Sequence, residues 1–411
     1  GLASAGAAYA PDVGWLIAGR AIMGAGAAMI MPATLSLLVS VFPDERERAT
    51  AVGIWAATAG LGVALGPVAG GLLLEHFWWG SIFLVNVPLC VLALLLGRRV
   101  VPESRDPAAP RVDWTGAGLS GAGLVALVWA VIEGPVAGWT SGRVLGAGLV
   151  AVLLLAAFVV QQRRVAEPLL DVRLFRNPRF SAASATIMVL FFALFGFLFL
   201  ATQYLQFVLG HSPSAAGVRV LPYAGAMIVF ASLSAKLVAA FGTKRVATLG
   251  MALFAAGLAV GATLSVGGGY GRLAVAFLLM GAGMGLAGAP ATESIMGALP
   301  PQRANIGSAV NDTTRELGGA LGVAVVGSIM SSLYSARAPG AGRDSLAAAV
   351  AAGPEVAAAA RDAFVEAMSR ASLVVAVVAA LGAVVAWRYL PSRPVATQEA
   401  LMPSRPIAPG R

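Results

Sequence analysis

The stretch GLGVALGPVAGG, residues 60–71, decides the fold, because it places five glycines and a proline inside the long apolar run 49–74. Glycine and proline are the two poorest helix formers in water. Gly62, Gly66 and Gly70 recur at every fourth position, so they form one smooth stripe on a helix. In lipid, such a stripe lets two helix backbones approach closely.

The proline in this stretch predicts a bend. Pro67 removes one backbone hydrogen bond from the helix, and the adjacent pair Gly70 and Gly71 makes the bend less costly. The sequence therefore predicts a kinked, close-packed contact between helices. For any single pair of glycines four apart, ordinary helix packing is the alternative interpretation.

Composition places the chain in the class of polytopic, all-α membrane proteins. Of its 411 residues, 58% are hydrophobic and only 11% are charged. A soluble domain carries roughly 25% charged residues, so this chain could not cover a soluble surface. Several runs exceed the roughly 20 apolar residues that cross a bilayer as a helix.

Charged and metal-binding residues exclude several classes of function. The net charge is +9, and the arginines lie in short loops between apolar segments, where the positive-inside rule places them. We therefore expect no nucleic-acid partner. The single cysteine, Cys90, allows no disulfide framework, and His76 and His211 lie near predicted segment ends. No metal or other cofactor is expected.

Hydropathy predicts about eleven complete transmembrane helices. Residues 1–9 look like the end of another helix. The segment 335–370 is expected on the outer side, and its alanine-rich portion is expected to be a surface helix. Residues 391–411 are expected to be a disordered tail. The predicted spans are 13–41, 49–74, 80–97, 115–133, 144–161, 180–208, 215–239, 245–265, 272–298, 304–333 and 371–390. Alternate loops carry most of the arginines, so these loops and the C-terminus are predicted to be cytoplasmic.

Two segments of the chain repeat each other. MGAGAAMIMPATLSLLVSVFP begins at Met23, and MGAGMGLAGAPATESIMGALPP begins at Met280. LGVALGPV at Leu61 likewise resembles LGGALGVA at Leu317, with the same offset of about 256 residues. Both pairs run in the same direction, as in transporters whose halves are related by an axis along the membrane normal.

The repeat predicts two six-helix halves joined by two linking helices. The halves are 1–100 and 166–390, and the linking helices lie in 101–165. The second half has three helices before its MGAG helix, whereas the first has only a short remnant. We therefore expect an N-terminal truncation of roughly 75–80 residues, and fourteen helices in the intact protein.

The motifs resemble those of a known transporter family. Residues 60–71 resemble the antiporter motif (motif C) of the major facilitator superfamily, and LIAGRAIMGAGAA, residues 16–28, resembles the motif that places an arginine, here Arg20, in the fourth helix (motif B). The fourteen-helix drug:proton antiporter (EmrB/QacA-type) branch is indicated by WWGSIFLVNVPL at Trp78, DWTGAGL at Asp113, EPLLDVRLFRNPRF at Glu167 and RELGGALGVAVVGSI at Arg315. The antiporter motif matches at Gly62, Gly66, Pro67, Gly70 and Gly71.

One part of the family pattern is absent. The loop motif between the second and third helices (motif A), and the acidic residue of the first helix, would lie before Gly1. FGTKRVATLG at Phe241 resembles a degenerate copy of that loop, with Lys244 and Arg245 but without the usual aspartate. The main proton-carrying carboxylate therefore has no position in this sequence.

Arg20 is the candidate for proton coupling. It lies roughly 10 Å into its helix, and a charge at depth costs at least ~2.5–3.5 kcal/mol on insertion scales. The resemblance implies that this arginine faces an acidic group and lowers its pKa. The alternative is an arginine whose side chain reaches back to the outer interface.

Further polar residues at membrane depth are candidates for the substrate cavity or a gate. Asn311, Asp312 and Arg315 lie on adjacent stripes of one helix, and a neutralised cytoplasmic gate or an interfacial helix end is the alternative to a substrate or proton role. Gln203 and Gln206 fit an interface better than a cavity. The full set of these candidates is Trp55, Gln203, Gln206, Glu293, Asn311, Asp312 and Arg315.

No constellation for bond-making chemistry is present, so we expect a transporter and not an enzyme. Residues 60–71 lack the lysine of a phosphate loop, and GGGYG at Gly267 is a turn. The loops are too short for a nucleotide-binding domain, so the energy must come from an ion gradient.

The resemblance implies a proton-coupled exporter of small hydrophobic or cationic compounds, working by alternating access. We expect a monomer in the bacterial inner membrane, with the lipid bilayer, protons and a drug-like substrate as partners. The alternatives are a narrow exporter of one endogenous metabolite or antibiotic, or a membrane fragment or sensor without transport.

Overall fold

The computed structural model describes the chain apart from residues 43, 45, 46, 48–50, 52–61, 63, 64, 102–112, 166, 167, 300–303, 339, 344 and 393–411. The described residues form helices and no strands. Ten helices among them are long and apolar enough to cross a membrane. The all-α polytopic class is confirmed. The eleventh predicted span, 49–74, lies partly outside the described residues, as does the predicted tail.

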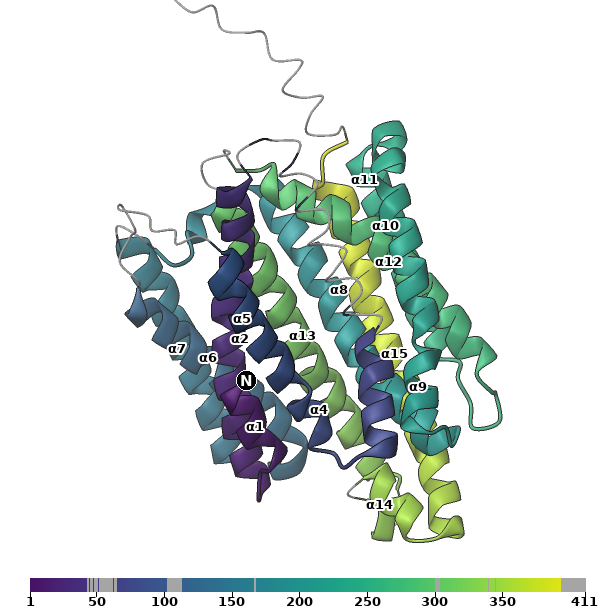
Figure 1. Cartoon of the computed structure of the whole chain (residues 1–411). Helices are drawn as coiled ribbons and strands as arrows, with labels where there is room; N and C mark the ends of the chain where they lie inside the picture. The colour runs from purple at the N-terminus through teal and green to yellow at the C-terminus, as the bar shows by residue number, and fades with distance from the viewer. Residues whose placement is uncertain are drawn as a thin grey trace, which may run out of the picture. The chain divides into compact units, whose positions relative to one another are not determined.

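The chain divides into two compact units, each described here by itself. The first unit contains residues 1–111 and 210–224, and the described part of it is helical (Figure 1). Its elements are α1 (Leu2–Ala8), α2 (Val13–Val41), a helix at 65–76, α4 (Ser81–Leu84), α5 (Asn86–Val100) and α9 (Pro213–Arg219). The assignment of 1–100 and 101–165 to a half and a linking pair stays a prediction.

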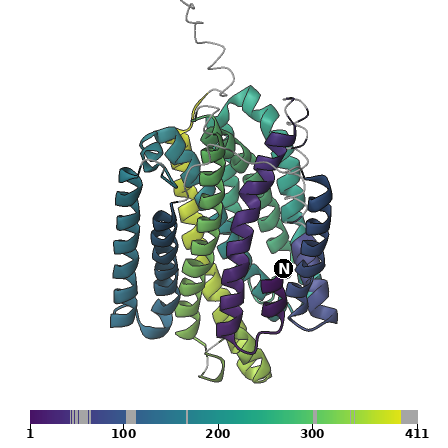
Figure 2. The same ribbon diagram turned by 60° about the vertical axis from the view of Figure 1, so that its left-hand side comes forward.

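The second unit contains residues 112–209 and 225–411. Its long helices run alongside one another, with α6 and α7 as an adjacent pair (Figures 1 and 2). The elements are α6 (Trp114–Ala137), α7 (Gly142–Arg164), η1 (Val172–Arg176), α8 (Pro178–Gln203), the π-turn η2 (Tyr204–Val208), α10 (Leu221–Phe241, from Gly225 on), α11 (Thr243–Gly261), α12 (Gly271–Met296), α13 (Ala304–Ser335), η4 (Gly340–Gly342), α14 (Leu346–Ala351) and α15 (Pro354–Tyr389).

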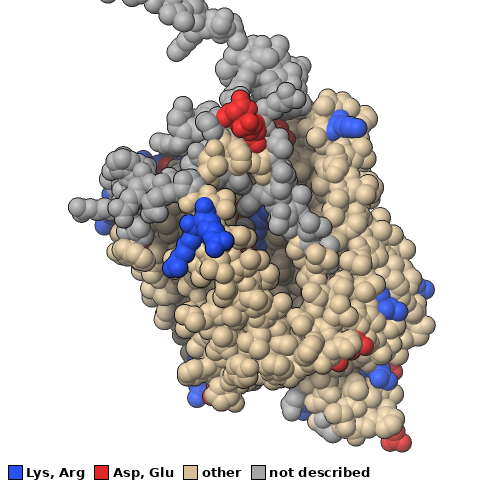
Figure 3. All heavy atoms as spheres, viewed as in Figure 1, with Lys and Arg blue, Asp and Glu red and all other residues tan. Residues whose placement is uncertain are grey.

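The outer surface of these helices is apolar. Figure 3 shows few charged side chains across the described part of the face that it draws. Exposed aliphatic side chains are numerous on α5, α7 and α15, for example Leu95, Leu153 and Leu381. Apolar patches of this extent do not face water in a soluble protein. The described helices therefore belong in a lipid bilayer.

Glycines let α13 pack directly on α8. A methyl group added at Gly322 would overlap the carbonyl oxygen of Phe192, and one at Gly318 would lie 2.5 Å from the carbonyl oxygen of Met188. The two glycines are four residues apart, so they form one small-residue stripe on α13. The backbone of α8 packs directly against that stripe.

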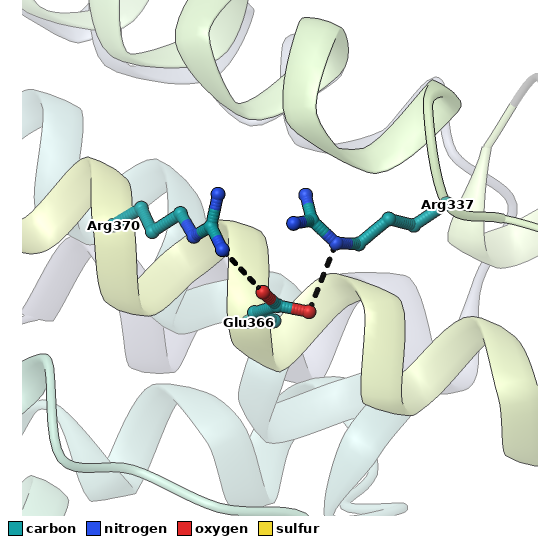
Figure 4. A network of polar contacts seen from close by, with 3 residues as sticks. All are labelled: Arg337, Glu366 and Arg370. Carbon is teal, nitrogen blue, oxygen red and sulfur yellow. Dashed lines mark hydrogen bonds and ion pairs between the residues drawn. The ribbon is translucent and has the colours of Figure 1, made fainter.

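The alanine-rich helix expected within 335–370 is present, but it is continuous with the last predicted span. α15 begins at Pro354, whereas the expected span begins at 371. Residues 354–370 are alanine-rich and carry charges, so a hydropathy scale misses them although alanine is the best helix former. Glu366 in this part of α15 accepts hydrogen bonds from Arg337 Nε at 3.0 Å and Arg370 Nη2 at 2.7 Å (Figure 4). These half-exposed ion pairs contribute little stability but fix the turn after α13 on α15.

Asp113 joins the two helices of the α6–α7 hairpin. It caps α6 by accepting a hydrogen bond from Gly116 N at 2.8 Å, and it accepts another from Gln162 Nε2 at 2.6 Å. These two donors, Gly116 first, hold the pKa of the Asp113 carboxyl below its usual range. The carboxylate therefore stabilises the fold above about pH 4, and this contribution is lost as the pH falls through the lowered pKa.

The α8–α13 contact predicts opposite results for two glycines on α13. Gly322→Ala should lower the free energy of unfolding by about 1–3 kcal/mol, because its methyl group has no space against Phe192. Gly327→Ala should be tolerated, since its methyl group would meet only Phe199 at an ordinary 3.5 Å. Thermal unfolding of the detergent-solubilised variants measures the difference. Equal stability of the two variants would contradict the contact.

Candidate functional site

Arg20 lies on α2 with an aromatic partner. Its guanidinium carbon is 5.9 Å from the centroid of the Phe83 ring, a distance at which the ring attracts a cation. Phe83 itself is fixed by Ser4, whose hydroxyl donates to the Phe83 carbonyl oxygen at 2.9 Å, and Asn86 Nδ2 donates to Ser4 Oγ at 3.0 Å. Among the described residues, no ion pair joins Arg20 to a carboxylate.

The close contact of the glycine-rich stretch is made by Gly71. A methyl group at Gly71 would overlap the carbonyl oxygen of Pro213 on α9, and one at Gly217 of α9 would overlap the carbonyl oxygen of Pro67. The two glycines therefore face each other's helix backbone reciprocally. The helix at 65–76 and α9 touch backbone to backbone within the first unit.

The predicted stripe behaves differently. Nothing described lies within 4 Å of a methyl group placed at Gly62, Gly66 or Gly70. The spacing of the glycines indicates a smooth face on the helix, but it does not indicate which neighbour covers that face. Trp55 lies outside the described residues.

Glu75 is a polar partner that the sequence analysis missed. It lies beyond the predicted span, at the end of the helix 65–76, and accepts a hydrogen bond from Ser212 Oγ at 3.2 Å. Hydrogen bonds from Ser214 and then Ser212 hold the pKa of the Glu75 carboxyl below its usual range. The pattern that could have predicted this contact is a carboxylate four residues after Gly71, together with two serines that flank Pro213 at the start of a helix.

A polar cluster joins α12, α13 and α8 in the second unit. Asn311 is buried and accepts a hydrogen bond from Thr292 Oγ1 at 3.2 Å. Arg315 Nη2 donates to the same Thr292 oxygen at 3.3 Å, and its guanidinium carbon lies 5.4 Å from the Phe191 ring centroid. Asn311 Nδ2 lies 3.5 Å from Asp312 Oδ1. The structure thus brings the three candidates on α13 together.

Two members of this cluster were not among the predicted site residues. Thr292 links α12 to α13, and Phe191 supplies the face of an aromatic ring from α8. A threonine and a phenylalanine in apolar helices carry no distinctive signal in the sequence. The carboxylates of Asp312 and Glu316 also act on Arg315 through space.

The remaining candidates lie apart from this cluster. Glu293, next to Thr292, is exposed, and its carboxylate acts through space on Arg179 of α8. Gln203 donates to the carbonyl oxygen of Phe199 in its own helix at 3.2 Å. Gln206 is half-buried in η2.

The π-turn in which Gln206 lies is braced at two points. Tyr204 Oη donates to the Ser265 carbonyl oxygen at 2.8 Å. Arg361 Nε donates to the Phe207 carbonyl oxygen, also at 2.8 Å. Neither Gln203 nor Gln206 takes part in these braces. Among the described residues, no group of three or more His, Cys, Asp or Glu side chains is placed to hold a metal ion.

Comparison with known proteins identifies relatives over most of the chain. Multidrug resistance protein Stp of Mycobacterium tuberculosis is 36% identical over 335 residues, which are 82% of this chain and 62% of that protein. Multidrug efflux pump LfrA of Mycolicibacterium smegmatis is 35% identical over 80% of this chain and 66% of its own length. A Methylenomycin A resistance protein of Streptomyces coelicolor is 35% identical over 80% of this chain and 70% of its own length.

The chain spans less than two thirds of the length of the first two relatives. The family model described as Major Facilitator Superfamily matches residues 1–323. This range includes the glycine-rich stretch, both repeats and the polar cluster on α13. The chain therefore belongs to the major facilitator superfamily.

Proposed function

We propose that the protein is a proton-driven exporter of small hydrophobic or cationic compounds and belongs to the fourteen-helix drug:proton antiporter branch of its family. The observation that carries this proposal is the reciprocal contact in which Gly71 of the antiporter stretch meets the backbone of α9 and Gly217 of α9 meets the backbone of the antiporter stretch. The names of the relatives, multidrug resistance protein and multidrug efflux pump, supply the substrate class. Membership in the family favours a transporter over an enzyme.

In this proposal the contact closes the outer side of the substrate path. Because Gly71 and Gly217 lack side chains, the helix 65–76 and α9 meet with no space between their backbones. Glu75 holds the end of the contact through Ser212. Opening to the outside requires the two helices to part, and closing excludes water and protons. Alternating access then couples inward proton flow to outward substrate flow.

Two arginines have proposed roles in coupling. Arg20 would lower the pKa of a carboxylate that approaches it, so that proton release depends on their separation. Arg315, with Asn311 and Asp312, would respond to a substrate or proton entering between α8, α12 and α13. Trp55, Gln203, Gln206 and Glu293 remain proposed contributors to the cavity or its gates.

We place the protein in the bacterial inner membrane as a monomer with a cytoplasmic C-terminus. A narrow substrate range is the second candidate function. It is favoured by relatives whose names specify one compound, such as the Tetracenomycin C resistance and export protein of Streptomyces glaucescens.

Efflux of ethidium from energised bacterial cells that express the protein from its own gene tests the proposal. Efflux should stop when an uncoupler removes the proton gradient. Arg20→Ala should reduce efflux to the background rate, because the charge that tunes the carboxylate is lost, whereas Arg20→Lys should retain part of the activity. Fluorescence of the dye follows the rate.

The controls for this experiment are the amount and thermal stability of each variant in the membrane. Efflux that continues with the uncoupler would contradict proton coupling. No efflux of ethidium by a folded protein, with efflux of a single compound from a wider panel, would support the narrow exporter instead.

The closing contact predicts different results for two adjacent glycines. Gly71→Ala should slow coupled efflux and increase proton leak, since its methyl group forces the helix 65–76 away from α9. Gly70→Ala is the matched control, because its methyl group would meet no described residue within 4 Å. Proton leak into vesicles containing the purified variants measures the effect. If both variants leak as little as the wild type, the contact is not the seal.

The cluster on α13 predicts non-additive stability. Arg315→Ala should lower the free energy of unfolding by about 2 kcal/mol, because it leaves Asp312 without its compensating cation and removes the contact with Thr292. Adding Asp312→Asn should restore part of this loss. The free energies of unfolding of the wild type, the two single variants and the double variant in detergent form a double-mutant cycle that measures the coupling. Strictly additive losses would show that the two side chains are not coupled.

A further inference from the structure

We propose that two basic cavities at the predicted cytoplasmic end of the second unit bind the headgroups of anionic phospholipids of the inner leaflet. Each cavity combines cationic side chains with apolar or aromatic ones. The proposal concerns lipid binding, and it holds or fails whether or not the protein exports drugs.

The first cavity lies between the end of α7 and η1. It has a volume of about 570 Å³ and is lined by Arg163, Val172, Arg173, Phe175 and Arg176. All three arginines are exposed, and among the residues that the structure describes, no acidic side chain lines the cavity. Among the described residues, none of these arginines forms an ion pair. Their charges are therefore available to a ligand.

Asp171, an acidic residue just before η1, holds the backbone of this turn. Asp171 Oδ1 accepts a hydrogen bond from Arg173 N at 3.0 Å and so caps η1. That bond fixes the backbone of η1, from which Arg173 and Arg176 extend. The turn thus presents two of the three arginines on a fixed support.

The second cavity lies where α11 begins and α15 ends. It has a volume of about 410 Å³ and is lined by Phe241, Lys244, Arg245, Trp387 and Ser392. Lys244 Nζ lies 5.2 Å from the centroid of the Trp387 ring. Lys244 N donates to the Pro391 carbonyl oxygen at 3.0 Å, which holds Pro391, just after α15, beside the start of α11. Again, cations and aromatic rings share one hollow.

Both cavities lie at the same end of the membrane spans. The end of α7 and the start of α8 are joined through η1, so they lie on the same side of the membrane. The spans Pro178–Val208 and Pro213–Phe241 then cross the membrane in opposite directions, so that α11 begins on that side again. Four further spans, α11, α12, α13 and α15, return it to the same side. In Figure 1 the start of α11 and the end of α15 lie at one end of the second unit. The charge bias of the loops predicts that this end is cytoplasmic.

The chemistry of the cavities fits a phospholipid better than a free anion. The guanidinium fork of arginine binds phosphate oxygens in pairs, and basic pockets on the cytoplasmic side of membrane helices bind anionic headgroups. Phe175, Phe241 and Trp387 are 38%, 56% and 53% exposed. Aromatic side chains of this kind lie at the level of the headgroups, where they contact glycerol and acyl chains. Positively charged loops that served only to orient the protein in the membrane would require neither a cavity nor aromatic side chains lining it.

Native mass spectrometry of the detergent-solubilised protein, titrated with phosphatidylglycerol or phosphatidylcholine, tests the proposal. Phosphatidylglycerol should remain bound in preference to phosphatidylcholine. The triple variant R163Q/R173Q/R176Q should weaken binding at the first cavity by about fivefold for each arginine removed. K244Q/R245Q should do the same at the second. The matched control is R143Q/R272Q, which removes two exposed arginines from the first turns of α7 and α12, at the other end of the spans.

Three results would overturn the proposal. The first is equal retention of the two lipids, and the second is unchanged binding of phosphatidylglycerol by both cavity variants. The third is binding of inorganic phosphate as tight as that of the lipid, which would indicate a plain anion site. Thermal unfolding verifies that each variant is folded. Because the two cavities are separate, either variant alone decides the outcome if the other does not fold.

Discussion

Close approach of helix backbones at glycine is the constraint on which the rest of this structure depends. Lipid tails are as apolar as leucine, so burial from water does not hold two helices together inside a bilayer. Contact must come from packing and from short distances between backbones. Gly318 and Gly322 bring α13 onto α8, and Gly250 and Gly283 bring α11 and α12 together in the same way. In the first unit, Gly71 and its counterpart on α9 make the equivalent contact.

The internal repeat separates what a motif specifies from what it does not. Gly62 and Gly66 correspond in the repeat to Gly318 and Gly322, with the same spacing on a helix. The second pair is covered by α8, whereas nothing described lies within 4 Å of the first pair. The spacing makes a smooth face available in both copies. Whether a helix covers the face depends on the neighbour, which the motif does not contain.

The sequence predicts the membrane spans well because length and apolar composition determine them. The spans 180–208 and 272–298 agree with 178–208 and 271–296 to within two residues. The alanine-rich helix expected within 335–370 is present, but its continuity with the span 371–390 was not predicted, because residues 354–370 are helical through alanine content and not through hydropathy. Hydropathy indicates which segments are apolar enough to lie in a bilayer, whereas helix propensity indicates which segments form helices. The two predictions differ wherever a helix extends beyond its apolar segment.

The candidate site was predicted less completely, for a different physical reason. The polar residues of α13 could be identified from sequence because charge at membrane depth is costly. Their partners could not, since Thr292 and Phe191 are ordinary residues of apolar helices. Glu75 was missed because its contact with Ser212 joins segments far apart in the chain. Periodicity within one helix carries no information about contacts of this kind.

The two arginines at membrane depth share one arrangement. Arg20 lies over Phe83 in the first unit, and Arg315 lies over Phe191 in the second. An aromatic face offsets part of the cost of removing a cation from water, but it does not neutralise the charge as a close ion pair would. A guanidinium held in this way keeps an electrostatic field, reduced at Arg315 by the carboxylates of Asp312 and Glu316, that would act on a carboxylate or a cationic ligand approaching it. In the proposed mechanism, this property, and not the presence of arginine alone, would connect the geometry with coupling between a proton and a substrate.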